Sequence, residues 1–145
     1  MTGADTTLAR RYLDMWNQGD MATLRELIAP DCVHSDPALP EVIRGPAAFE
    51  QLVQLYRTAF PDLAFTLEDV IAEGDRVAFR WRARGTQRGE LMGIPPTGIT
   101  GEVTGMEFLR VAGGQIVEDW TNWDALGLLQ QLGAVPKPGQ AAASA

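Results

Sequence analysis

The sequence predicts a single α+β domain in which three N-terminal helices pack on a curved antiparallel sheet to form a cone. Apolar residues recur at helical spacing up to residue 60, and from residue 63 they alternate with polar residues, as in half-buried strands. A chain of 145 residues with 46% hydrophobic content suits one domain with a substantial core. We expect this domain to span residues 1–135, and residues 136–145 to form a flexible tail that is poor in apolar bulk.

The three helices are predicted from residues that can cap or stop them. An aspartate or a glycine-proline pair precedes each stretch of apolar residues at helical spacing, and a glycine or proline follows it. The expected starts and stops are Asp5 with Gly19, Asp20 with Pro30, and Gly45-Pro46 with Pro61. Residues 31–44 are typical of a short strand followed by an irregular loop.

The strands are predicted as two antiparallel hairpins. Glu73-Gly74-Asp75 is expected to turn the first hairpin, and Ala112-Gly113-Gly114 is expected to join residues 101–111 to residues 115–123. A loop rich in glycine and proline separates the hairpins, and a short helix over residues 125–132 follows them.

Composition and charge exclude several classes of partner. The net charge is −7 and the 12 Lys and Arg residues are scattered, so we expect no surface for nucleic acid or an anionic membrane. No apolar run approaches the ~20 residues that span a bilayer, and the N-terminus is not typical of a signal peptide. Cys32 is the only cysteine, so we expect a packed thiol, which is compatible with the cytoplasmic location that we predict.

The last hairpin is the most informative stretch, because it brings two acidic residues together. A three-residue loop would place Glu107 opposite Asp119, on a face that also carries Gly105, Leu109, Val117, Thr121 and Trp123. If that face is concave, the two carboxylates meet in an apolar hollow, where like charge and burial raise a carboxyl pKa. Such a pair supplies an acid and a base together. Alternatively, both acids lie solvated at the sheet rim, and a two-residue loop would reverse the parity and remove the pair.

A second group of candidate residues precedes the third helix. His34 is the only histidine, and Asp36 would share its face on a strand and could orient the imidazole; alternatively, His34 only packs. One histidine without a cysteine pair lacks the usual metal ligand set, so we expect no metal and no other cofactor. Trp16, Tyr56 and Met92 are candidate walls of a pocket for a small apolar organic substrate, or plain core residues.

The opposite face of the last hairpin predicts a partner. It would carry Met106, Phe108, Ile116 and Trp120, which form a large apolar patch if they face water. Burial against a second copy of the chain would cover this patch. We therefore expect a homodimer formed through the sheet.

Three motifs resemble those of the SnoaL-like polyketide cyclases. They are Trp16-Asn17-Gln18-Gly19-Asp20, Met92-Gly93-Ile94-Pro95-Pro96-Thr97-Gly98, and Gly114-Gln115-Ile116-Val117-Glu118-Asp119-Trp120. The similarity covers roughly residues 5–135. It implies the NTF2-like cone fold.

The resemblance also implies an activity. The founding cyclases close a ring by an intramolecular aldol reaction without a cofactor, using an Asp on the last strand as acid/base and a His on the preceding strand. In this chain Thr121 occupies that Asp position, Glu107 occupies the His position, and His34 corresponds to a family Asn. Asp119 lies two residues before Thr121 on the same face and is the candidate replacement.

These observations predict a cofactor-independent acid/base cyclase or isomerase acting on a polyketide- or terpenoid-like substrate. The expected catalytic residues are Asp119, Glu107, His34 and Asp36, and the expected substrate-binding residues are Trp16, Tyr56, Met92, Thr121 and Trp123. Two alternatives remain open: an epoxide hydrolase or epoxide-opening cyclase of the same fold, and a binding protein without chemistry.

Overall fold

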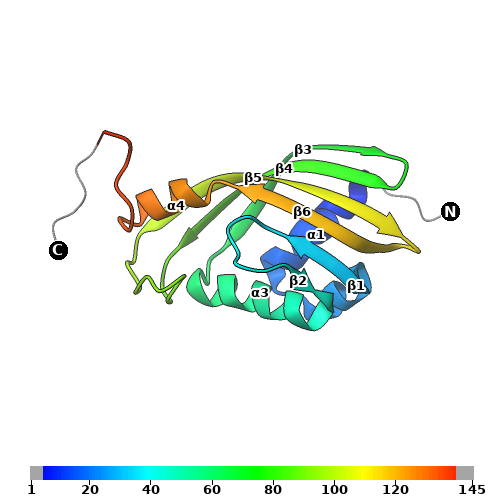
Figure 1. Ribbon diagram of the computed structural model, residues 1–145, viewed down its shortest axis with the longest axis horizontal. Coiled ribbons are helices and arrows are strands. Elements are labelled where there is room, and N and C mark those ends of the chain that lie inside the picture. Colours follow the sequence, from blue (N-terminus) through cyan, green and yellow to red (C-terminus); the bar gives the residue numbers. More distant parts are fainter. Residues whose placement is uncertain (1–4, 140–145) are drawn as a thin grey trace.

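The computed structural model describes residues 5–139 and confirms the α+β class (Figure 1). The helices are α1 (Thr6–Gln18), α2 (Met21–Leu27), α3 (Gly45–Ala59) and α4 (Ala125–Gln131). The strands are β1 (Ile28–Ser35), β2 (Ile43–Arg44), β3 (Ala64–Glu73), β4 (Arg76–Thr86), β5 (Thr100–Ala112) and β6 (Gln115–Trp123). Most of the tail predicted for residues 136–145 lies outside the described residues.

One curved sheet runs through the described part of the chain in the order β2-β1-β6-β5-β4-β3. Strands β3 to β6 pair antiparallel, as predicted, but β1 lies parallel to β6. Because of this parallel pair, the end of β1 lies beside the middle of β6, where His34 is the register partner of Asp119. No local pattern in the sequence indicates a pairing between residues so far apart.

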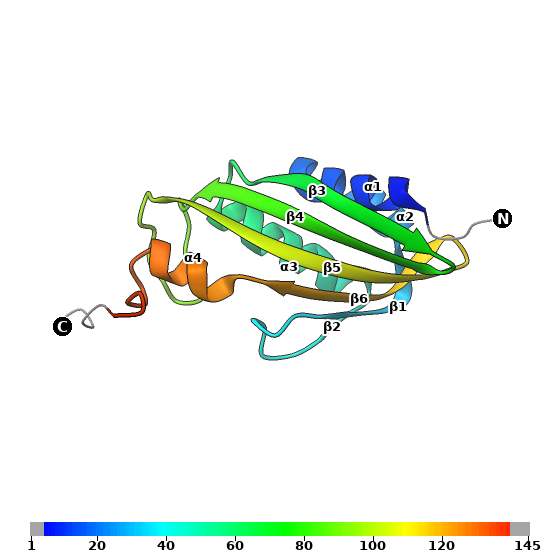
Figure 2. The same cartoon turned by 90° about the horizontal axis from the view of Figure 1, so that it is seen from above.

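The helices cover one face of the sheet. Figures 1 and 2 show α1 and α3 side by side against this face, with α4 beyond the end of β6. The predicted cap Asp5 accepts hydrogen bonds from the first-turn N–H groups of α1, and Asp20 accepts one from Thr23 at the start of α2. The second helix ends earlier than predicted, and Pro30 lies in β1, where the pairing with β6 is irregular and a missing N–H is tolerated.

The last hairpin differs in register from the prediction, but its parity is the same. The loop has two residues, since Ala112 pairs with Gln115, and a β-bulge near Val117 then shifts the register by one. Glu107 is therefore the partner of Thr121, whereas Asp119 pairs with Leu109. Glu107 and Asp119 still share the helix-covered face.

The bulge also moves one residue from the outer face to the core. Ile116 is fully buried, whereas Met106, Phe108 and Trp120 lie on the outer face with exposed fractions of 59%, 39% and 36%. Phe108 and Trp120 contact each other edge to face at 5.8 Å between ring centroids. These three residues form the apolar patch on which the homodimer prediction depends, and the homodimer itself stays a prediction.

Two further expectations concern single features. Cys32 is a buried free thiol, as predicted. Among the described residues, no helix combines the length and the apolar character needed to span a membrane.

Candidate active site

A cavity lies between the helix-covered face of the sheet and helices α1 and α3. Its walls are mostly apolar and aromatic, and they include Leu13, Trp16, Leu52, Phe65, Trp81, Val103 and Trp123. Polar side chains enter the wall at only a few places, as is typical of a site for a small organic molecule. The lining of this cavity is therefore mostly apolar, and its use as a substrate pocket stays a prediction.

The cavity runs beside the first part of β5. Glu107 lines one end and Gly101 the other, and six residues of extended strand span about 20 Å. At the Gly101 end, Phe60 packs on Gly85 and Leu128 packs on Gly101. At the other end, the wall includes His34, Glu107 and Thr121, and we call these three residues the polar end of the cavity.

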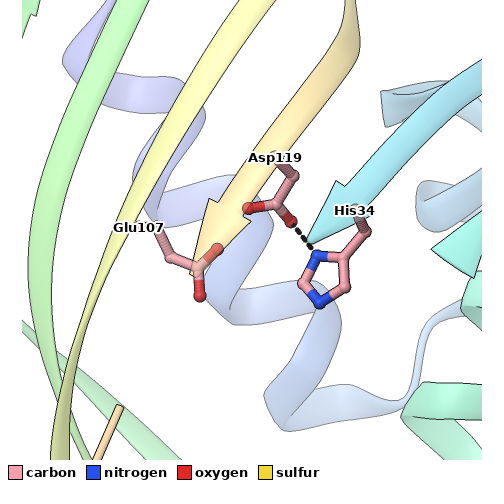
Figure 3. Close-up of side chains that lie close together, drawn as sticks. All are labelled: His34, Glu107 and Asp119. Atoms are coloured by element: carbon pink, nitrogen blue, oxygen red, sulfur yellow. Dashed lines mark hydrogen bonds and ion pairs between the residues drawn. The ribbon is translucent and has the colours of Figure 1, made fainter. Parts of the chain in front are cut away.

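Three titratable side chains meet at or behind the polar end. His34 Nδ1 lies 2.7 Å from Asp119 Oδ2, and Tyr12 donates its hydroxyl hydrogen to the same oxygen at 2.8 Å. Figure 3 shows Asp119 between His34 and Glu107, with its second oxygen on the side of Glu107. Asp119 is fully buried and is not among the cavity-lining residues, so it lies behind the wall that His34 and Glu107 form.

Glu107 is held in a form that carries a proton. Burial, the neighbouring Asp119 charge and a hydrogen bond with Asp119 raise the pKa of Glu107 well above its ordinary value. Its Oε1 accepts hydrogen bonds from Trp81 Nε1, at 3.2 Å, and from Thr121 Oγ1. The buried oxygens Glu107 Oε2 and Asp119 Oδ1 have no other partner among the described residues, and one proton between the two carboxyls satisfies both.

Asp119 is the anionic member of the pair. Burial disfavours its charge, but the hydrogen bonds from Glu107, His34 and Tyr12 outweigh burial and lower the pKa of Asp119. Burial likewise disfavours the imidazolium, yet the Asp119 charge and hydrogen bond raise the pKa of His34 above its ordinary value. With Nδ1 bonded to Asp119, Nε2 of His34 has no hydrogen-bond partner among the described residues and belongs to a side chain that lines the cavity.

Comparison with known proteins identifies the family. Residues 6–132 match the family described as SnoaL-like polyketide cyclase. The chain belongs to this family. It is 33% identical over 134 residues to an aklanonic acid methyl ester cyclase from a Streptomyces species, covering 87% of this chain and 80% of the relative. It is also 33% identical over 121 residues to the nogalonic acid methyl ester cyclase of Streptomyces nogalater, covering 81% and 89%.

Solved structures agree with this assignment. The crystal structure of IdmH, a putative polyketide cyclase from Streptomyces antibioticus, matches with a TM-score of 0.78 and 39% identity, covering 88% of this chain and 97% of that one. TsrD from Streptomyces laurentii matches with a TM-score of 0.81 and 29% identity, covering 91% and 99%. The predicted NTF2-like cone of the SnoaL-like family is therefore confirmed.

The structure places most of the predicted site residues of this SnoaL-like protein around the cavity. Trp16, Tyr56, Thr121 and Trp123 line it, as do His34, Glu107 and Asp36. Asp36 does not orient the imidazole as expected, because its carboxylate accepts hydrogen bonds from Trp123 Nε1 and from the N–H of Ala38. Met92 does not line the cavity; it lies in the loop after β4 and is 45% exposed.

Two residues that hydrogen-bond to the carboxyls at or behind the polar end were not predicted from the sequence. Tyr12 and Trp81 each donate a hydrogen bond to a buried carboxyl, Tyr12 to Asp119 and Trp81 to Glu107. Both fit apolar core positions, Tyr12 in a helical stripe and Trp81 in a strand with alternating burial. The apolar periodicity explains both residues as core, and nothing in it indicates that the Tyr12 hydroxyl or the Trp81 indole N–H bonds to a carboxyl.

The same cluster is also the candidate for a metal site. His34, Glu107 and Asp119 offer ligand atoms that lie within 4.8 Å of one another. To bind a cation, Glu107 would have to lose its proton, and Asp119 Oδ2 already accepts hydrogen bonds from His34 and Tyr12. The donor set as arranged here therefore fits a shared proton better than a metal ion.

Replacing Glu107 with glutamine is expected to change how stability depends on pH. The folded chain keeps a proton on Glu107 that the unfolded chain releases above the ordinary pKa of 4.5, so the free energy of unfolding falls as pH rises from that value to the folded pKa. The fall is at most about 1.4 kcal/mol per pH unit. Glutamine does not titrate, and its amide can donate to Asp119 and accept from Trp81. We expect Glu107→Gln to be more stable than the natural chain at pH 8, with the difference shrinking toward pH 4.5.

Urea unfolding at several pH values measures this difference. Glu41→Gln is the matched control, because Glu41 is exposed and its replacement should leave the pH dependence unchanged. Parallel stability curves for the natural chain and Glu107→Gln would contradict a buried, protonated Glu107.

Proposed function

We propose that this protein catalyses the intramolecular aldol ring closure of a polyketide-like ketone, with His34 as the general base and Glu107 as the general acid. One observation carries the proposal: a histidine nitrogen that has no hydrogen-bond partner in residues 5–139 lies close to a buried carboxyl with a raised pKa, and both side chains line an apolar cavity. A base and an acid at the same place are what enolisation next to a carbonyl requires.

The reaction needs two proton transfers and no redox step. Nε2 of His34 removes a proton from the carbon next to one carbonyl, and Glu107 turns its proton from Asp119 to the carbonyl oxygen, where negative charge develops. The resulting enolate carbon attacks a second carbonyl carbon of the same molecule, and the new alkoxide takes up a proton. Product and substrate are isomers, so the step requires no co-reactant.

Asp119 serves this reaction as a positioning residue. Its Oδ2 accepts from Nδ1 of His34, which fixes the tautomer whose Nε2 lone pair is free, and its charge stabilises the imidazolium that forms. Its other oxygen faces the Glu107 carboxyl, so one anion holds both the base and the acid. The role that the sequence analysis gave to Asp119 thus passes, in this proposal, to the two side chains in front of it.

The names of the relatives and the carboxyls that line the cavity both favour ring closure rather than epoxide opening. The relatives are named as cyclases of aklanonic acid methyl ester and nogalonic acid methyl ester. Epoxide opening asks for an ionised carboxylate that activates water. Of the cavity-lining carboxyls, Glu107 retains its proton, and both oxygens of Asp36 already accept hydrogen bonds.

Incubation of the protein with aklanonic acid methyl ester and with nogalonic acid methyl ester tests the proposal. We expect a product of unchanged mass with one more ring, formed equally well in the presence of EDTA. In D₂O, deuterium should enter the carbon next to the carbonyl. His34→Phe keeps an aromatic ring against Phe49 but removes the base, so it should slow the reaction by about 10²–10⁴-fold.

The outcome also separates the alternatives. Tight binding with neither ring closure nor deuterium exchange would indicate a binding protein without chemistry. Full activity of His34→Phe would exclude the assignment of the base.

A further inference from the structure

Tyr56 lines the apolar cavity and carries a buried polar atom. It extends from α3 between Trp16 and Trp123, with ring centroids 6.1 Å from each indole. Its hydroxyl is buried and has no hydrogen-bond partner among the described residues. Native proteins rarely leave a buried hydroxyl unpaired, because the lost hydration destabilises the fold. Phenylalanine would fill the same space without this cost.

Asp36 lies beside Tyr56 and gives this part of the cavity a negative charge. Its Oδ2 accepts a hydrogen bond from Trp123 Nε1 at 3.0 Å, and the ring of Trp123 also contacts Tyr56 edge to face. Burial and the Asp36 charge raise the pKa of Tyr56 above its ordinary value, so the phenol keeps its hydrogen. Tyr56 is thus a donor, and what it lacks is an acceptor.

Arg84 also lines the cavity, but the charge that acts on the phenol of Tyr56 is that of Asp36, and it limits what the acceptor can be. In a cavity with apolar walls, two like charges repel more strongly than in water. A carboxylate bound at Tyr56 would face the Asp36 carboxylate, whereas the oxygen of a ketone or an ester carries no net charge. The two side chains together select a neutral acceptor.

We propose that Tyr56 is a specificity-determining residue, which donates a hydrogen bond to a neutral carbonyl oxygen of the substrate while Asp36 excludes molecules with a carboxylate at that place. This inference rests on the proposed function, which supplies the class of substrate, a polyketide-like ketone. Tyr56 would hold the substrate at a second point and would take no part in the proton transfers at His34 and Glu107. A substrate held at both points has its reacting carbons fixed along the cavity.

Three naphthalene probes that differ in one substituent test this selection by calorimetric titration. They are 2-acetylnaphthalene with a neutral carbonyl, 2-naphthoate with a carboxylate, and 2-ethylnaphthalene without oxygen. We expect the natural chain to bind the ketone at least about tenfold more tightly than the carboxylate. Tyr56→Phe should weaken binding of the ketone about tenfold and leave binding of the hydrocarbon unchanged. Asp36→Asn should strengthen binding of the carboxylate.

Thermal unfolding supplies an independent readout. Removing an unpaired buried hydroxyl should raise the unfolding midpoint of Tyr56→Phe by a few degrees. Tyr12→Phe is the matched control, because Tyr12 is the other tyrosine of the chain and its hydroxyl is bonded to Asp119, so its loss should lower the midpoint. Opposite shifts for the two variants are expected.

Two results would overturn the proposal. Unchanged affinity of Tyr56→Phe for the ketone would show that the hydroxyl contacts no ligand. An equal loss of affinity for all three probes would show that Tyr56 contributes only through the packing of its side chain. Because the probes do not react, binding as expected without ring closure of the polyketide esters would reject the proposed function and leave this inference standing.

Discussion

Replacement of Asp119 with asparagine is expected to lower turnover by about 10³-fold while leaving the protein folded. Asp119 presents an acceptor in two directions, Oδ2 to His34 and Tyr12 and Oδ1 to the Glu107 carboxyl. An amide has one acceptor end and one donor end. If its oxygen faces His34, its NH₂ group faces Glu107 and favours the ionised carboxylate, which cannot act as an acid. If its NH₂ group faces His34, the imidazole takes the tautomer whose Nε2 carries hydrogen and cannot act as a base.

Nuclear magnetic resonance can follow this change without any substrate. His34 is the only histidine in the sequence, so the imidazole nitrogen signals need no further assignment. The charge and hydrogen bond of Asp119 raise the pKa of His34, and removal of that charge should therefore lower it. Asp36→Asn is the control for the tautomer, because Asp36 is bonded to Trp123. Its charge also raises the pKa of His34, so this variant should lower that pKa but leave the tautomer unchanged. An unchanged tautomer, pKa and turnover in Asp119→Asn would contradict the positioning role.

Much of the fold could be predicted because its signals are local. The capping aspartates, the glycine-proline start of α3 and the change of period after Pro61 each act over a few residues. The alternation along β4 predicted which of its side chains are buried. These features depend on backbone geometry and burial and need no knowledge of distant contacts.

The site was less predictable because it depends on register and on long-range pairing. The Glu107 and Asp119 pair was predicted from a three-residue loop, whereas the protein has a two-residue loop and a bulge near Val117 that restores the parity. A bulge adds one residue without a reliable signal in the sequence. The partner of His34 was predicted as Asp36 because that residue is close in sequence, whereas the parallel pairing of β1 and β6 brings Asp119 to it.

The sequence pattern also does not show how far each side chain of the sheet lies from the cavity, and the proposed roles of Glu107 and Asp119 depend on that distance. Glu107, Asp119 and Thr121 share one face of the sheet, yet Glu107 and Thr121 line the cavity and Asp119 lies behind it. Tyr12, from α1, and His34, from the neighbouring strand β1, both bond to Asp119 and line the cavity in its place. Alternation assigns a face to each residue, but only packing between elements decides which side chain reaches a ligand.

Replacement of Gly105 with alanine is expected to reduce the free energy of unfolding by about 3 kcal/mol. A Cβ atom at this position would lie 2.3 to 2.7 Å from atoms of the Trp81 indole, so the ring must move. Gly105 has no positive φ, and the cost is therefore one of space alone. Movement of the indole also breaks the hydrogen bond from Trp81 Nε1 to Glu107, which is the acid in the proposed mechanism.

Gly101→Ala is the matched control on the same strand. Its added Cβ would meet the ends of two flexible side chains, Leu128 at 2.9 Å and Gln131 at 3.4 Å, which can shift, so we expect a loss of about 1 kcal/mol or less. Urea unfolding compares the two variants, and the double variant Gly105→Ala with Trp81→Phe should recover part of the stability because the smaller ring leaves room for the methyl group. Equal losses for Gly105→Ala and Gly101→Ala, or no recovery in the double variant, would contradict the close packing of Trp81 on β5 that shapes the polar end of the cavity.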